Sequence, residues 1–128
     1  MEQHRAPLKQ DWRAKETLNT ISKFFVEKNA QSLNVFIIPD DPRIHSPLIS
    51  LAYLKRKSIY FAVGSWENIA NSKADLVITK DGNWMVPPHF LEKINQSVKW
   101  FEENIDKFSL VKKINLPDNS SLLIYKKD

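Results

Sequence analysis

The spacing of apolar residues changes along this chain, from the three-to-four-residue period of a helix to the continuous apolar runs of a buried strand. In the first 30 residues, apolar side chains recur every three or four positions, at Ala14, Leu18, Ile21 and Phe25, which is typical of a helix with one buried face. Val35–Ile38 has no polar alternation, and such runs are typical of a parallel strand covered on both faces. We therefore expect this strand to lie in the middle of a sheet.

Capping and turn residues set the other expected boundaries. Asp11 is expected to cap the first helix, which ends near Lys28. Ser46 followed by Pro47 has the form of an N-cap and a first-turn proline, and predicts the start of a second helix. The remaining predicted elements are strands over 58–63 and 75–79, a short helix over 66–70, a loop over 80–89, a long amphipathic helix over 91–105 and a hairpin that turns at 117–120.

This order predicts an α/β fold. Helices alternate with the first three strands, which is the pattern of a parallel sheet with right-handed crossovers. The last two strands are close enough to pair only as an antiparallel hairpin. We expect a three-layer, Rossmann-like sandwich with a mainly parallel sheet and the C-terminal hairpin at one edge. Residues 1–10 are polar and basic, so we expect them to be a flexible leader. We expect residues 11–128 to form one domain.

Composition excludes several classes of protein. The chain has 128 residues and no cysteine, so disulfides, thiolate metal sites and a cysteine nucleophile are excluded. The longest apolar runs, Val35–Ile38 and Ile59–Val63, are far shorter than the ~20 residues of a membrane helix, so we expect a soluble chain. The net charge of +4 is mild, and we favour a solvated basic surface over attraction to anionic lipid or to a phosphate-bearing ligand.

Candidate chemistry begins at Asp40 and Asp41, directly after the predicted central strand. Ligands gather beyond the carboxyl ends of parallel strands, where these carboxylates could hold a divalent cation or act as an acid and base pair. The alternative, which we favour, is that an aspartate before a proline forms a turn and caps a helix. His45 could share the same crevice, although a solvated histidine is the simpler interpretation.

The other candidates lie in later loops. Gly64 and Ser65 follow a predicted strand, where backbone amides can meet an anion, but they match neither dinucleotide-binding nor P-loop spacing. Asp81 belongs to a turn signal at the same expected edge of the sheet. Trp84 and Met85 are large apolar residues in a loop, and could form a contact surface or fold back onto the core. We predict no catalytic residue, no metal site, no cofactor and no nucleic-acid partner.

Two terminal segments resemble a known family. Asp11–Trp12–Arg13 opens a helix in DWRAKETLNTI, and the chain closes with LPDNSSLLIYKK. Both resemble the ends of the soluble C-terminal domain of polytopic, dolichyl-phosphate-mannose-protein mannosyltransferase-like glycosyltransferases. The strand that runs into Pro39–Asp41 and the segment Ala74–Thr79 are also similar to that pattern.

The resemblance implies an extracytoplasmic domain that follows many membrane helices, in a membrane enzyme that transfers a hexose from a polyprenyl-phosphate sugar donor. In that family the catalytic carboxylates lie in the membrane portion, so no residue of this chain inherits a catalytic role. The implied partners are the membrane portion of the parent enzyme and the polyprenyl-phosphate sugar donor or the acceptor. The domain would be a fragment of a hexosyltransferase, inactive alone.

The alternative is a free-standing α/β module that binds a small ligand in the crevice at Asp40, Gly64 and Asp81. An independent enzyme ranks third, because the acidic, basic and nucleophilic residues do not converge in the sequence.

Overall fold

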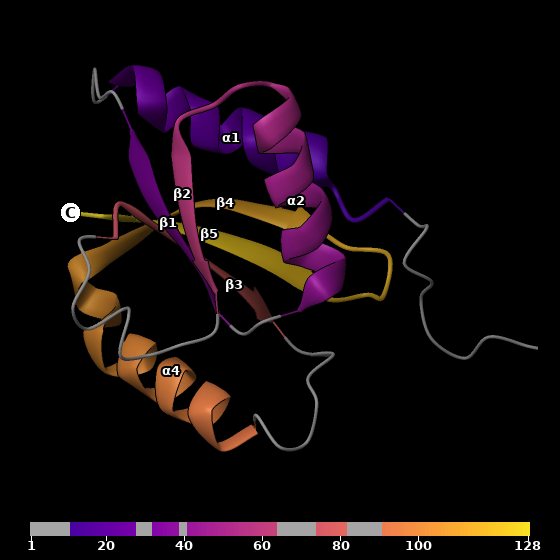
Figure 1. Cartoon of the computed structure of the whole chain (residues 1–128). Helices are drawn as coiled ribbons and strands as arrows, with labels where there is room; N and C mark the ends of the chain where they lie inside the picture. The colour runs from indigo at the N-terminus through magenta and orange to yellow at the C-terminus, as the bar shows by residue number, and fades with distance from the viewer. Residues whose placement is uncertain (1–10, 28–31, 39–40, 64–73, 82–90) are drawn as a thin grey trace, which may run out of the picture.

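A computed structural model describes residues 11–27, 32–38, 41–63, 74–81 and 91–128 (Figure 1). The elements in chain order are α1 (Ala14–Glu27), β1 (Leu33–Ile38), α2 (Pro42–Leu54), β2 (Ile59–Val63), β3 (Leu76–Asp81), α4 (Leu91–Asn104), a short 3₁₀ helix η2 (Ile105–Lys107), β4 (Phe108–Asn115) and β5 (Ser121–Lys127). The predicted leader over 1–10 and the predicted short helix over 66–70 lie outside the described residues.

All five strands join one mixed sheet in the order β2-β1-β3-β5-β4. β1 lies between β2 and β3 and is parallel to both, with Leu33 beside Ile59 and Val35 beside Leu76. β5 is antiparallel to β3 on one side and to β4 on the other. β1, which was predicted to lie in the middle of the sheet, is therefore an interior strand. The strand in the middle of the five is β3.

The prediction of a mainly parallel, Rossmann-like sheet is wrong. Antiparallel pairing begins at β3, because β5 returns along its full length, from Leu76 to Asp81. β4 and β5 are also the longest strands, with 8 and 7 residues, so the hairpin forms a large part of the sheet. Exposed lysines such as Lys112 and Lys113 lie inside β4 and interrupt its apolar residues. The apolar pattern therefore did not indicate how long this strand is.

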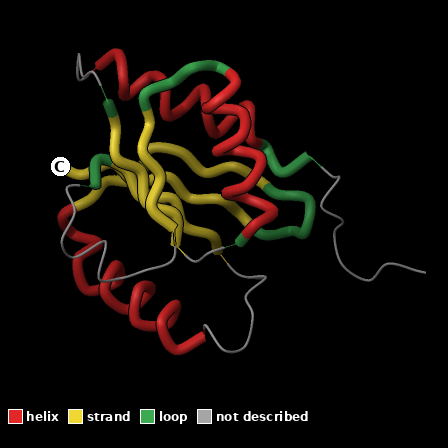
Figure 2. The backbone as a smooth tube through the Cα atoms, in the orientation of Figure 1, coloured by secondary structure: helices red, strands yellow, loops and turns green. Residues whose placement is uncertain are grey.

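Helices cover both faces of the sheet (Figure 2): α1 and α2 lie on one side and α4 on the other. β1 supplies both cores because successive side chains point to opposite faces. Val35 and Ile37 join the cluster under α1 and α2, whereas Phe36 and Ile38 join the smaller cluster with Phe101 of α4. All four are buried, which confirms the prediction that this strand is covered on both faces.

The helix starts differ from those predicted. Asp11 accepts from the backbone N–H of Arg13 at 2.8 Å, and α1 begins only after that turn. α2 begins at Pro42 with Asp41 as its N-cap, so Pro47 lies inside the helix and the predicted Ser46 cap is wrong. An aspartate directly before a proline supplies both a capping oxygen and a preset φ, which starts the helix earlier.

Candidate functional site

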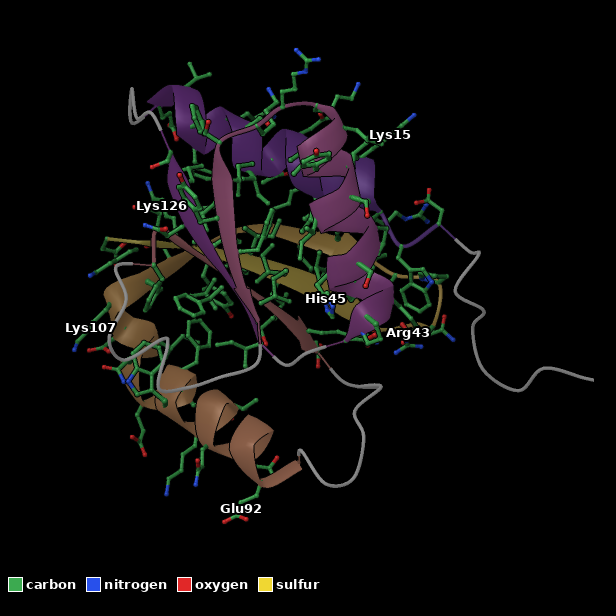
Figure 3. The ribbon with its side chains drawn as sticks, viewed as in Figure 1. Lys15, Arg43, His45, Glu92, Lys107 and Lys126 are labelled. Carbon is green, nitrogen blue, oxygen red and sulfur yellow. The ribbon has the colours of Figure 1, made fainter. Side chains whose placement is uncertain are left out.

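The most concentrated chemistry in the described residues is an ion-pair cluster of Asp41, Arg43, Lys80 and Asp118. Four separate parts of the chain meet there: the N-terminus of α2, the end of β3, the turn between β4 and β5, and Trp12 just before α1. Figure 3 labels Arg43 at the start of α2, close to His45.

Asp41 and Arg43 form the inner pair. The Asp41 carboxylate accepts the backbone N–H of Arg43 at 3.0 Å, which is the N-cap hydrogen bond of α2. Arg43 also donates from Nε to Oδ1 at 3.0 Å and from Nη2 to Oδ2 at 2.8 Å. Bidentate pairing of this kind fixes both side chains, and it satisfies a helix N-terminus at the same time. The Asp41 residue is fully buried, with 0% exposure.

Lys80 links this pair to the β4–β5 turn. Its Nζ donates to Asp118 Oδ2 at 2.6 Å and lies 3.7 Å from Asp41 Oδ2. Arg43 Nη2 lies 3.8 Å from Asp118 Oδ2 and closes the ring of contacts. Two carboxylates and two cations make the cluster electrically balanced, which is the condition under which buried charges are tolerated.

Trp12 lies against both cations. Its ring centroid is 4.5 Å from the Arg43 guanidinium carbon and 5.5 Å from Lys80 Nζ. The residue is buried, so the indole separates the two charges from water and supplies cation–π attraction. Trp12 is also a member of the larger hydrophobic core cluster.

The turn that carries Asp118 is itself held by this carboxylate. Asp118 accepts the backbone N–H of Ser120 at 3.1 Å and the Ser120 hydroxyl. Leu116 O accepts from Asn119 N at 3.2 Å, and Asn119 has a φ of 67°, which asparagine tolerates better than most residues. The predicted Pro-Asp-Asn-Ser turn is therefore confirmed, and the cluster contact fixes its position.

The cluster shifts the acid–base behaviour of two members. Burial raises the pKa of Asp118, but hydrogen bonds from Lys80 and Ser120 outweigh burial, so the pKa lies below its ordinary value. The hydrogen bond to Asp41 raises the pKa of Arg43. Both shifts favour the charged forms of these two side chains, the Asp118 carboxylate and the Arg43 guanidinium.

This geometry is suited to holding the fold together. A catalytic acid or base must reach a substrate, whereas the Asp41 carboxylate and the Lys80 ammonium are enclosed, each with 0% side-chain exposure. Among the residues that the structure describes, no group of three or more histidine or acidic side chains could hold a metal ion. The cluster therefore joins α2, β3 and the β4–β5 turn electrostatically.

The predicted site residues are only partly brought together. Asp41 belongs to the cluster, and its favoured interpretation as a helix cap is confirmed. His45 follows in the first turns of α2 and is half-buried. Asp81 ends β3 and is exposed, and the alternation of the strand directs it to the face opposite Lys80. The candidates outside the described residues are Asp40, Gly64, Ser65, Trp84 and Met85.

Sequence reasoning missed Arg43, Lys80 and Asp118 as members of a common site. One signal was present: Lys80 continues the alternation of Leu76 and Ile78, which are core residues, so its position in phase with them indicates a buried lysine. A buried lysine requires an acidic partner, but the sequence did not identify which aspartate it would be.

Comparison of the chain with protein-family models, with curated proteins and with solved structures finds no significant match. Within the described parts of the chain, no helix has the length and apolar content needed to cross a membrane.

Proposed function

We propose that this chain is a non-catalytic, extracytoplasmic accessory domain of a membrane glycosyltransferase that transfers a hexose from a polyprenyl-phosphate sugar donor. One observation supports the proposal: the two terminal segments that carry the resemblance lie together in the fold. Arg13 Nε donates to Asn115 O at 3.3 Å, and Trp12 lies against Arg43 and Lys80, which both contact Asp118. The two terminal segments that carry the resemblance therefore meet in one core cluster, which includes Trp12, Leu116 and Leu122.

The chemistry of the ion-pair cluster supports a non-catalytic role. Its two carboxylates and two cations are engaged with one another and largely shielded from solvent, so the loss of one partner would leave an uncompensated buried charge. In this proposal the transfer reaction belongs to the membrane portion of the parent enzyme, and the domain contacts that portion or the polyprenyl-phosphate substrates outside the cytoplasm.

The reading frame of the natural gene provides the first test. We expect it to continue upstream of Met1 through several hydrophobic spans. An in-frame stop codon directly before a genuine start at Met1 would contradict the proposal.

Activity measurements provide the second test. The parent enzyme, assayed with a polyprenyl-phosphate hexose in membranes, should transfer sugar, and this chain alone should not. Transfer by the isolated chain would show that it is an enzyme in its own right.

A ligand panel separates this proposal from a free-standing binding module. An accessory domain should keep its melting temperature across nucleotides and sugar phosphates. A saturable rise that is lost in Asp81→Asn would instead favour the small-ligand module, since ligand binding to the native state stabilises it by mass action.

A further inference from the structure

The C-terminal end of α2 exposes large apolar side chains directly beside a basic run. Tyr53 is 82% exposed and Leu54 is 75% exposed, although both belong to a helix whose other side is buried. Lys55, Arg56 and Lys57 follow at once and are exposed as well. These five residues, 53–57, are called here the basic-apolar patch.

The backbone holds the patch in a defined shape. Arg56 N donates to Tyr53 O at 3.0 Å and Lys57 N donates to Ala52 O at 3.0 Å, which together form the Schellman pattern of a helix C-terminus. Arg56 occupies the left-handed position of this pattern with a φ of 54°. Glycine is the usual residue there, so an arginine keeps a charge at a conformational cost.

The start of β1 lies directly beside the residue that follows the patch. Leu33 N donates to Ser58 O at 3.1 Å, so the segments that lead into β1 and β2 lie side by side. The helix that precedes β1 also exposes an apolar side chain near its end, since Val26 is 79% exposed. The described charges in the second half of α1, Lys23 and Glu27, are of opposite sign, so they do not change the basic character of the patch.

This end of the domain lies opposite the ion-pair cluster. α2 starts near the labelled Arg43 and runs to the other end of the sheet before the chain enters β2 (Figure 3). The two ends of α2 therefore lie in different environments, because its N-terminus is buried in the ion-pair cluster and its C-terminus faces solvent.

We propose that the basic-apolar patch docks this domain onto the surface of a bilayer that contains anionic lipid. Tyrosine suits the headgroup boundary because its ring can be buried while its hydroxyl remains hydrated. Leucine adds apolar surface that can be buried at the same depth. Three adjacent cations complement anionic headgroups, and each contributes to surface attraction. The combination of both features on one rigid helix end favours a lipid surface over a purely electrostatic partner such as nucleic acid.

The inference goes beyond the proposed function and does not rest on it. Vesicle binding is measured on this chain alone, whereas the proposed function depends on the gene upstream and on the parent enzyme. Failure of either one leaves the other testable.

The test is flotation of the chain with vesicles of neutral phosphatidylcholine, with and without about one-third phosphatidylglycerol. We expect binding to the anionic vesicles only, and weakening with added salt. Lys55→Gln/Lys57→Gln should lower the partition coefficient about 25-fold, since each basic side chain near an anionic surface is worth roughly fivefold. Tyr53→Ser/Leu54→Ser should lower it about tenfold or more by removing the apolar contribution.

The matched control removes the same charge elsewhere. Lys112→Gln/Lys113→Gln changes two exposed lysines of β4 and should leave binding within about twofold if the patch is specific. The lipid proposal is wrong if wild-type protein binds neither vesicle, if it binds both equally, or if the control loses as much as the patch variant. It is also wrong if the wild-type protein dimerises in sedimentation velocity and Tyr53→Ser/Leu54→Ser abolishes the dimer without changing vesicle binding. That result would identify the patch as a contact between two copies of the chain.

Discussion

Replacing Lys80 with methionine tests the central claim about the ion-pair cluster. Methionine keeps much of the lysine stem and fills the same space, so the change removes mainly the ammonium group. In the native structure this group lies 2.6 Å from Asp118 and 3.7 Å from Asp41, with 0% side-chain exposure. The variant leaves two carboxylates to share the single guanidinium of Arg43 inside the protein.

The expected loss is about 3–5 kcal/mol, because breaking a buried ion pair leaves an uncompensated charge. A domain of this size has a total stability of about 5–15 kcal/mol, so the variant should unfold at a much lower urea concentration. Adding Asp118→Asn restores charge balance and keeps an oxygen that can accept from Ser120 N. The loss in free energy of unfolding in the double variant should therefore be about 1–3 kcal/mol smaller than the sum of the losses in the two single variants.

Urea unfolding monitored by tryptophan fluorescence provides the measurement. Trp12, one of the four tryptophans of the chain, lies over Arg43 and Lys80 and contributes to this signal. Lys113→Met, at an exposed position of β4, is the matched control and should change stability by less than about 0.5 kcal/mol. If Lys80→Met costs no more than this control, or if the two changes are simply additive, Lys80 is not a buried partner of Asp118 and the described cluster is wrong.

Three further predictions concern the cluster and the helix ends. The pKa of Asp118 is lower in the folded protein than in the unfolded chain, so its charge contributes stability at pH values above the ordinary aspartate pKa. That contribution is lost as the pH falls from about 5 through the folded pKa. In Asp118→Asn the urea midpoint should therefore change less with pH over this acidic range. Asp41→Ala should be less stable than Asp41→Asn by about 1 kcal/mol in urea unfolding, since asparagine can still cap α2. Arg56→Gly should raise stability by about 1 kcal/mol by relieving the left-handed backbone, seen as a higher urea midpoint.

Each of these has an outcome that contradicts it. An Asp118→Asn protein with the wild-type acid dependence would show that the pKa of Asp118 is not lowered by folding. Equal stability of Asp41→Asn and Asp41→Ala would mean that the capping bond to Arg43 N contributes nothing. The control for Arg56→Gly is Arg56→Ala, which also has a Cβ; an equal gain in both would attribute the effect to charge and not to φ.

The elements were predictable where one local signal dominated. Apolar periodicity placed α1, β1 and α4, and the Pro-Asp-Asn-Ser turn fixed the hairpin. The prediction failed where local signals competed. Ser46–Pro47 and Asp41–Pro42 both have the form of a helix start, and the structure uses the earlier one, because Asp41 also gains Arg43 and Lys80 as partners. The contact with Lys80 comes from β3 and is not visible in the local sequence.

The sequence by itself determined the order of the main helices and strands and which positions of β1 are buried, because these follow from side-chain periodicity. Only the tertiary structure decided where the hairpin pairs: β5, and not β4, lies against β3, which makes the sheet mixed. The same pairing brings Asp118 to Lys80 across 38 residues of chain. Ion pairs between distant segments depend on strand order, and strand order depends on how the whole core is covered, so no local pattern could have identified Lys80 as the partner of Asp41 and Asp118.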